Sequence, residues 1–391
     1  MQSIGPDGYY RKGRNPHRSP QRSALHTLQA IPKSVRLLLI TIVSLCAFAG
    51  VSRGRANLLD QVKKAHPTDF SRLRAFNLSV WPPSHPIRYN NGTHIDDRYT
   101  YISHLGTGQE GSVSLYEDSE GTAVAVKTFS LAARNQIPFE LVEDFIDLTT
   151  TWPTEIEAGV LLNSLRDASF VPVLDYFILQ EPAGWTWAFA SPLQLGGTLL
   201  SLAERERLAY NPSSLESLDR FYRPSLLSLL SVLEDLHLAG ICHDDIKPDN
   251  IFIGQDSRHW MLGDLGNVRE VKHPWHQTAS WIRQNQLPDC KTNDVKRTLK
   301  TYLSFLRAAS NDADAFDRQF WGRGTALSRM YWDFVLYPLD AGRLARLSGI
   351  RYSPNHGTEL DIISTAGSGD LREATEHELT CTSLPRRLWF T

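Results

Sequence analysis

The stretch ICHDDIKPDNIFIG, residues 241–254, sets one histidine, three aspartates, one lysine and one asparagine between two apolar ends. Charged side chains next to buried strand material are costly unless they are paired or used. A surface loop could carry them without any function. A site for a magnesium-bound phosphate, in contrast, needs carboxylate and amide oxygens beside a cation. The rest of the sequence has to separate these two interpretations.

Strand-like runs come first along the chain, and helical patterns come later. Three such runs cover residues 99–108, 111–118 and 122–130, separated by a glycine-rich turn and a hairpin signal. A buried helix is expected over 225–239 and an amphipathic helix over 294–307. Strands followed by helices predict an α+β fold.

The turn after the first strand reads LGTGQEGSV and contains Gly106, Gly108 and Gly111 in a G-x-G-x-x-G pattern, followed by Val113. Glycines allow the backbone to approach a phosphate closely and to aim amides at it. A dinucleotide-binding fold would continue as a helix, but residues 112–116 continue as a strand. The pattern therefore favours a hairpin that covers a nucleotide.

Lys127 lies in the alternating strand VAVKTF. A half-buried lysine needs an anion, and a nucleotide phosphate together with a helix carboxylate would serve. The helical segment PTEIEAGVLLNSL supplies two candidates for that carboxylate. Glu157 precedes Val160 and later leucines at helical spacing and is the predicted partner, and Glu155 is the alternative.

The opening stretch then acquires a chemical meaning. Asp245 and Asn250 are five residues apart, with Lys247 between them. A carboxylate that accepts a hydroxyl proton, a lysine near the transferred phosphate and a metal-binding amide are the parts that phosphoryl transfer needs on one short loop. Asp264, fourteen residues after Asn250, follows an apolar run and suits a second magnesium ligand. His243 is expected to brace the loop.

Together these motifs resemble the eukaryotic protein kinase superfamily, over about residues 99–310. The glycine-rich loop, V-A-V-K, the helix glutamate, H-x-D-I-K-P-x-N and D-L-G occur in that family's order. Lysine two residues after the catalytic aspartate resembles the serine/threonine class. The resemblance implies a bilobal fold with a small β-rich N-lobe over 97–195 and a larger helical C-lobe over 196–352.

The resemblance also assigns roles. It implies an ATP-dependent and Mg²⁺-dependent protein serine/threonine kinase with a protein substrate. The nucleotide would be held by the glycine-rich loop with Val113, by Lys127 paired with Glu157, and by the backbone N–H of Gln194 in the linker SPLQLGG. The catalytic residues would be Asp245 as base and Lys247 as a phosphate contact. Asn250 and Asp264 would bind the metal.

Three features depart from the family pattern. Asp244 stands where the family has the arginine that binds a phosphate on the activation loop, and an acid cannot do this. No A-P-E follows D-L-G, and Asp294, which resembles the aspartate of the next large helix, comes only thirty residues after Asp264. The segment between Lys127 and Glu157 is also longer than usual. A nucleotide-binding pseudokinase or scaffold and a small-molecule kinase are therefore alternatives.

The N-terminal region differs from the rest of the chain. Residues 1–36 are rich in Pro, Arg, Ser and Gly, and we expect them to be disordered. Residues 37–51, LLLITIVSLCAFAGV, carry no charge and predict a single-pass membrane anchor of undecided orientation. A cleaved signal or transit segment is the alternative. Residues 52–96 are expected to be a linker or extension, and 353–391 a tail.

Charge and cysteine content add little. The 391 residues have a formal net charge of −2, which gives no indication of a nucleic-acid partner. The four cysteines show no metal-ligand spacing, so the sequence predicts neither a disulfide framework nor a zinc site.

Overall fold

The structure is a computed structural model. It describes residues 33–64, 66, 68, 87–89, 94–95, 98–108, 110–130, 153–165, 168–181, 184–209, 214–350, 372–373 and 379. The chain divides into two units, Met1–Val62 and Lys63–Thr391. The predicted disorder of residues 1–36 falls almost wholly outside the described residues, although the helix described next already begins at Lys33.

Helix α2, Lys33–Lys64, is longer than the predicted apolar segment at both ends. Its apolar run of fifteen residues would rise about 22 Å as a helix, which is less than the roughly 30 Å of a bilayer core. Among the described residues, no helix has both the length and the apolar character that crossing a membrane requires. The prediction of a single-pass membrane anchor at 37–51 is therefore wrong.

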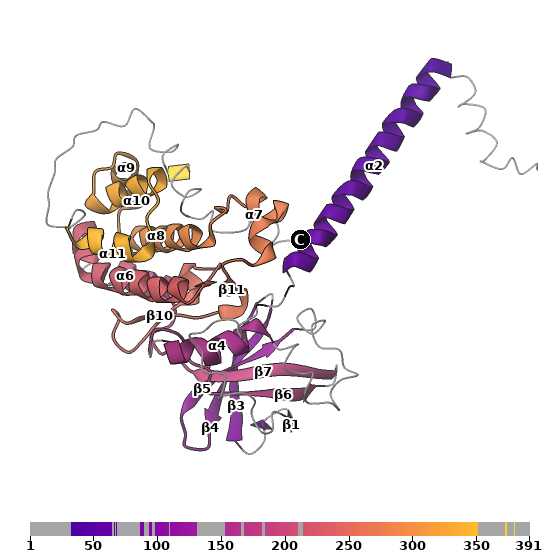
Figure 1. The fold of residues 1–391 in the computed structure, drawn as a ribbon. Helices are drawn as coiled ribbons and strands as arrows, with labels where there is room; N and C mark the ends of the chain where they lie inside the picture. The colour runs from indigo at the N-terminus through magenta and orange to yellow at the C-terminus, as the bar shows by residue number, and fades with distance from the viewer. Residues whose placement is uncertain are drawn as a thin grey trace, which may run out of the picture. The chain divides into compact units, whose positions relative to one another are not determined.

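A seven-stranded sheet opens the second unit (Figure 1). Its order is β1-β6-β7-β5-β4-β3-β2, and only β1 and β6 pair in parallel. The strands are β1 (Ile87–Tyr89), β2 (His94–Ile95), β3 (Tyr99–Thr107), β4 (Gly111–Asp118), β5 (Ala123–Phe129), β6 (Asp175–Glu181) and β7 (Gly184–Pro192). The first two lie inside the predicted linker 52–96, which therefore contributes to the sheet.

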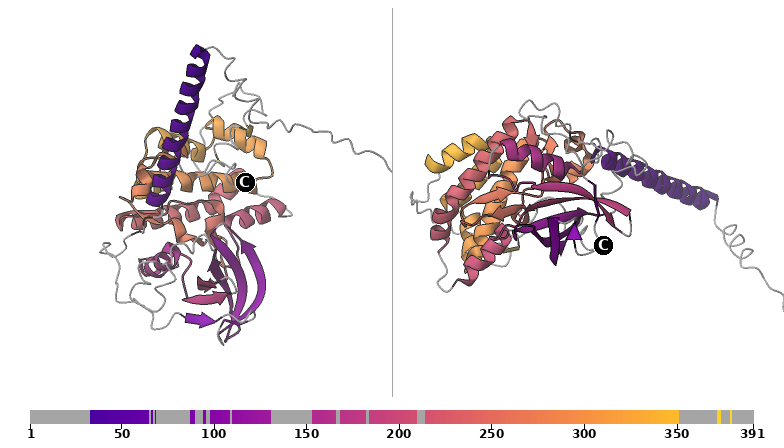
Figure 2. Two further views of the ribbon diagram at one scale, coloured as in Figure 1. Left: turned by 90° about the vertical axis from the view of Figure 1, so that its right-hand side faces the viewer. Right: turned by 90° about the horizontal axis from the view of Figure 1, so that it is seen from below.

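The helical part follows the sheet and is larger (Figures 1 and 2). Its helices are α5 (Leu199–Leu208), α6 (Leu215–Leu238), α7 (Ala279–Arg283), α8 (Cys290–Ala309), α9 (Ala313–Trp321), α10 (Ala326–Leu336) and α11 (Ala341–Ile350). Strand β8 (Ile241–Cys242) pairs with β11 (Arg269–Glu270), and β9 (Ile251–Ile253) pairs with β10 (Trp260–Leu262). Short 3₁₀ helices are η6 (Pro248–Asn250), η7 (Leu265–Asn267) and η8 (Pro274–Gln277).

Each part has its own apolar core. One cluster joins α5, α6 and α8–α11 through residues such as Leu233, Leu299 and Phe320. A second cluster packs on one face of the sheet and includes Val124 and Val126 of β5. Because side chains alternate along a strand, the side chain of Lys127 lies on the opposite face. The β-sheet followed by a larger helical part confirms the predicted α+β order.

Helix α4 (Thr154–Leu165) comes between β5 and β6 in the sequence, and its buried apolar side chains join the core of the helical part. It contacts η7, the short helix that follows Asp264. Close packing at this helix depends on Gly159, because a Cβ there would meet the side chain of Val173 at 2.4 Å. The sheet, α4 and η7 thus bring charged residues from distant parts of the sequence together.

Candidate active site

Lys127 is the point at which the two parts meet. It lies on β5, between β4 and β7. Its Nζ donates to Glu155 Oε2 of α4 at 2.5 Å and to Asp264 Oδ1 at 3.2 Å, and its side chain is only 15% exposed. Burial alone lowers the pKa of Lys127, but the charges of Glu155, Asp264 and Glu110 outweigh burial and raise it. The lysine is therefore charged at neutral pH.

The partner of Lys127 differs from the predicted one. The sequence predicted Glu157, and the structure places Glu155 on the Nζ. Successive helical residues are about 100° apart, so positions 155 and 157 face nearly opposite directions. Glu155 is buried on the same stripe as Gly159 and Leu162, whereas Glu157 is half-buried on another stripe. Gly159, four positions after Glu155, marks the closely packed face of α4 and is the feature of the sequence that could have identified Glu155.

The glycine-rich turn joins β3 to β4. The amide of Gly108 donates to the carbonyl of Gly111 at 2.8 Å and closes the turn. Gly111 is required by packing, because a Cβ there would lie 2.1 Å from the carbonyl oxygen of Thr128. At Gly106 a Cβ would meet no atom within 4 Å, so this glycine is not needed for internal packing. Open space next to Gly106 leaves the backbone accessible to a ligand.

The loop after β8 concentrates the polar residues of the opening stretch. Asp245 is buried, and its Oδ2 accepts from Lys247 Nζ at 2.9 Å and from Asn250 Nδ2 at 3.2 Å. The same amide nitrogen donates to the carbonyl of Asp245 at 2.8 Å. Burial opposes the charge of Lys247, but Asp245 raises its pKa. The structure therefore brings together the three residues that the sequence predicted on this loop.

Asp264 lies after β10 and directly before η7. Its φ of 52° lies in the left-handed region, which costs a non-glycine residue about 1–2 kcal/mol. Such a conformation persists only where the surroundings fix it. Burial raises the pKa of Asp264, but Lys127 and then Lys247 outweigh it and lower the pKa. An ionised carboxylate is thus held between two lysines.

Lys127, Glu155, Asp245 and Asp264 line one cavity of about 1190 Å³. Both the sheet part and the helical part contribute to its wall. The predicted site residues border it, including Val113 and Gln194, with the exception of Glu157. Gln194 lies after β7, and its side-chain amide donates to the carbonyl of Pro192 at 3.1 Å. That carbonyl keeps a second lone pair for another donor.

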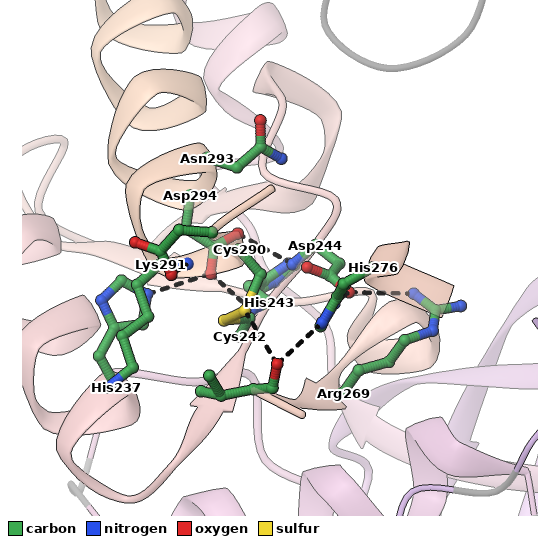
Figure 3. The surroundings of a disulfide bond; sticks show 12 residues. His237, Cys242, His243, Asp244, Arg269, His276, Cys290, Lys291, Asn293 and Asp294 are labelled. Atoms are coloured by element: carbon green, nitrogen blue, oxygen red, sulfur yellow. Dashed lines mark hydrogen bonds and ion pairs between the residues drawn. A yellow bond between two sulfur atoms is a disulfide. The ribbon is translucent and has the colours of Figure 1, made fainter. Parts of the chain in front are cut away.

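Asp244 is a functional candidate whose surroundings the sequence did not predict (Figure 3). Its φ is 64°, and its carboxylate is buried. Asp244 Oδ2 accepts from Arg269 Nη1 at 3.3 Å and from His276 Nε2 at 2.7 Å. Arg269 also donates to the carbonyl of Asn267 at 2.8 Å. The loop that carries Asp245 is thereby tied to the segment after η7.

Asp294 anchors the same loop from the other side (Figure 3). This residue is fully buried in the first turns of α8 and accepts the backbone N–H groups of His243 at 2.7 Å and Asp244 at 2.9 Å. Burial opposes its charge, but hydrogen bonds and charge from His237 and His243 lower its pKa. The sequence singled out Asp294 as the aspartate of this helix, and the structure gives its contacts.

Cys242 and Cys290 form a disulfide, which corrects the prediction that the cysteines carry none. The two residues are 48 positions apart, so no local spacing could have indicated the pair. Cys46 is a free and exposed cysteine of α2.

Comparison with known proteins agrees with this geometry. The chain is 30% identical to a serine/threonine-protein kinase of Arabidopsis thaliana over 195 residues, which cover 48% of the chain and 29% of that protein. It is 28% identical to the serine/threonine-protein kinase UCN of the same plant over 224 residues, 56% of the chain and 52% of that protein. PknA, a serine/threonine-protein kinase of Nostoc, is 27% identical over 187 residues, 45% of the chain and 28% of that protein.

The chain thus spans between about a quarter and about half of the length of these relatives. No protein-family model matches it. The similarity supports a relationship to the protein kinase superfamily over about half of the chain.

Proposed function

We propose that this chain is an ATP-dependent phosphotransferase of the protein serine/threonine kinase type. The observation that carries the proposal is the double contact of Lys127 with Glu155 and Asp264. It places a buried cation and the carboxylate of Asp264 on the same cavity as Asp245. The named kinase relatives support the same class of reaction. We assign the sheet part, apart from β1 and β2, to the N-lobe that the resemblance implies over 97–195, and the helical part to the C-lobe over 196–352.

We expect the sheet part to bind the nucleotide. The open space at Gly106 gives backbone amides access to phosphates, and Lys127 supplies a fixed positive charge. Glu155 holds the lysine in place, so the ammonium does not have to be ordered when ATP binds. Gln194 lies where the linker can present its backbone N–H to the adenine ring.

The donor set fits Mg²⁺, which prefers carboxylate and amide oxygens. Asp264 offers an ionised carboxylate, and its pKa is lowered by the adjacent lysines. Asn250 turns its Nδ2 toward Asp245, which leaves its amide oxygen as the metal-binding atom. Bound Mg²⁺ would neutralise phosphate charge during transfer.

Asp245 would orient the acceptor hydroxyl and take up its proton as the oxygen attacks the γ-phosphorus and the bond to the β-phosphate oxygen breaks. Lys247, 2.9 Å from Asp245 Oδ2, holds the carboxylate in place and can contact the transferred phosphate. A protein hydroxyl is the proposed acceptor, because the relatives are named protein kinases.

The experiment is phosphate transfer from labelled ATP to a library of serine- and threonine-containing peptides, with the purified full chain and with or without Mg²⁺. We expect transfer that requires Mg²⁺ and that is lost in Asp245→Asn, while nucleotide binding persists. Asp256→Asn is the matched control, because it is the same substitution at an exposed turn.

Binding of ATP without transfer to any peptide would contradict the proposal and favour a nucleotide-binding scaffold. Transfer to members of a metabolite panel, with no label on protein, would favour a small-molecule kinase. Equal rates for the parent and Asp245→Asn would remove Asp245 from the mechanism.

A further inference from the structure

The disulfide lies directly beside the proposed catalytic loop (Figure 3). Cys242 is the last residue of β8, three positions before Asp245. Cys290 is the first residue of α8, whose N-terminus is capped by the side chain of Asp289. Both cysteines are buried, with exposed fractions of 0% and 1%. The bond therefore ties the entry to the loop covalently to the start of α8.

Non-covalent bonds join the same two elements. One turn into α8, Asp294 accepts the backbone N–H groups of His243 and Asp244. These two residues come immediately after Cys242, so three consecutive positions are fastened to one helical end. Cys242 also pairs with Arg269 across β8 and β11. The disulfide is thus the covalent member of a cluster of ties that sets the position of the loop.

The loop needs such ties because its backbone conformation at Asp244 is unfavourable. Asp244 has a positive φ of 64°, a conformation that a non-glycine residue keeps only where its surroundings fix it. One oxygen of its carboxylate, Oδ1, is buried and has no hydrogen-bond partner among the described residues. If the tie at Cys242 is broken, the chain can relax at Asp244, and the next residue is Asp245.

We propose that Cys242–Cys290 is a thiol–disulfide control site that acts on the proposed phosphotransferase. In the oxidised form the bond fixes the loop that carries Asp245, and reduction by a dithiol releases the loop and lowers the rate of transfer. The two cysteines are positioning residues, because they act through Asp245. The effect on activity rests on the proposed function, whereas the bond and its effect on the loop do not.

The exchange is a two-electron reaction. A thiolate of the dithiol attacks one sulfur of the Cys242–Cys290 bond, forms a mixed disulfide and displaces the other cysteine as a thiolate. The second thiol of the reagent then displaces the remaining cysteine, so that the dithiol is oxidised to its disulfide and both cysteines end as thiols. Because both sulfurs are buried, the start of α8 has to open before attack, and we expect reduction over minutes to hours.

The first readout does not depend on enzymatic activity. Peptide mapping of the full chain without reductant should yield a peptide that links Cys242 to Cys290. Hydrogen exchange before and after dithiol treatment should then show faster exchange at 241–250 and 290–296 and unchanged exchange at β5. A linked peptide with no change in exchange at the loop after complete reduction would overturn the proposed control site.

The second readout is activity. On reduction, kcat should fall about tenfold or more, since a displacement near 1 Å can cost about a hundredfold. The affinity for nucleotide measured without Mg²⁺ should be unchanged, because Lys127 and the glycine-rich turn lie on the sheet part. Reoxidation should restore kcat. Cys46→Ser is the matched control and should respond to the dithiol as the parent does.

Cys290→Ser should have a low kcat and no response to the dithiol. If this variant does not fold, reduction of the folded parent still gives the test. Unchanged kcat after confirmed reduction would overturn the proposal, whereas absence of transfer in every form would count against the proposed function alone. Free thiols at both Cys242 and Cys290 in the native protein, together with one bound zinc per chain, would overturn the proposal in favour of a metal site, because a carboxylate oxygen of Asp244 lies within 4.8 Å of both sulfurs.

Discussion

The carboxylate that Lys127 uses can be identified by exchanging two glutamates of α4 one at a time. Glu155→Gln keeps the shape of the side chain and removes its charge, and Glu157→Gln makes the same change two positions later on another face of the helix. Only the first change touches the 2.5 Å contact with Lys127. We therefore expect Glu155→Gln to lower phosphotransfer and Glu157→Gln to leave it nearly unchanged.

The expected size follows from the contacts that remain. Lys127 keeps Asp264 at 3.2 Å and Glu110 at 3.8 Å, so it does not become an unpaired buried charge. The change replaces a hydrogen bond between two charged groups by one between the Lys127 ammonium and a neutral amide oxygen, so only one partner stays charged and we expect a loss of about 1–2 kcal/mol. At about 1.4 kcal/mol per tenfold, kcat/KM should fall about 5- to 30-fold.

The assay is the initial rate of peptide phosphorylation with ATP varied, next to thermal unfolding of both variants. Because the lysine stays charged but is less well positioned, we expect part of the loss to appear in KM for ATP. An equal loss in both variants, or a larger loss in Glu157→Gln, would contradict the assignment of Glu155. A large drop in Tm in Glu155→Gln alone would assign the effect to folding.

Three further predictions concern other parts of the site. Gly111→Ala forces a methyl group into the backbone of β5 and should cost about 1–3 kcal/mol of stability, seen as a lower Tm, whereas Gly106→Ala, next to open space, should not change the Tm. Asp294→Asn should lower the free energy of unfolding by about 3 kcal/mol. Because the pKa of Asp294 is lowered in the folded state, this difference should be complete above about pH 4 and should shrink as the pH falls further, which urea unfolding against pH measures. Phosphatase treatment should leave the activity unchanged, because Asp244 cannot bind a phosphate on the segment 266–294, and an increase in activity on phosphorylation of that segment would contradict this.

Strands and turns were predictable because their signals are local. The three predicted runs match β3, β4 and β5 to within one residue, since alternation and glycine punctuation depend only on neighbouring positions. The amphipathic helix over 294–307 lies within α8. The loop contacts of Asp245 were predictable for the same reason, because Lys247 and Asn250 are within five residues of it.

Features that depend on packing escaped prediction. The sequence placed the start of the buried helix at residue 225, after Pro224, but α6 begins at Leu215. Pro224 is exposed, so the carbonyl that loses its intrahelical bond can face water. Helix α4 is apolar on more than one side, so periodicity alone did not distinguish Glu155 from Glu157. The Cys242–Cys290 pair requires the path of the chain over 48 positions.

The charge at Asp244 explains how the segment after η7 is held without an added group. An arginine at this position would need an anion from elsewhere, whereas an aspartate needs a cation, and the chain supplies Arg269 two residues after η7. His276 adds a second contact, with one ring nitrogen on Asp244 at 2.7 Å and the other on the carbonyl of Val271 at 3.1 Å. Because Asp244 and Arg269 are both buried, removing either one leaves an uncompensated charge, which costs far more than the intact pair contributes. The ion pair that holds this segment therefore needs no added group. The Cys242–Cys290 disulfide, in contrast, is the only cross-link among the described residues that a reductant can break.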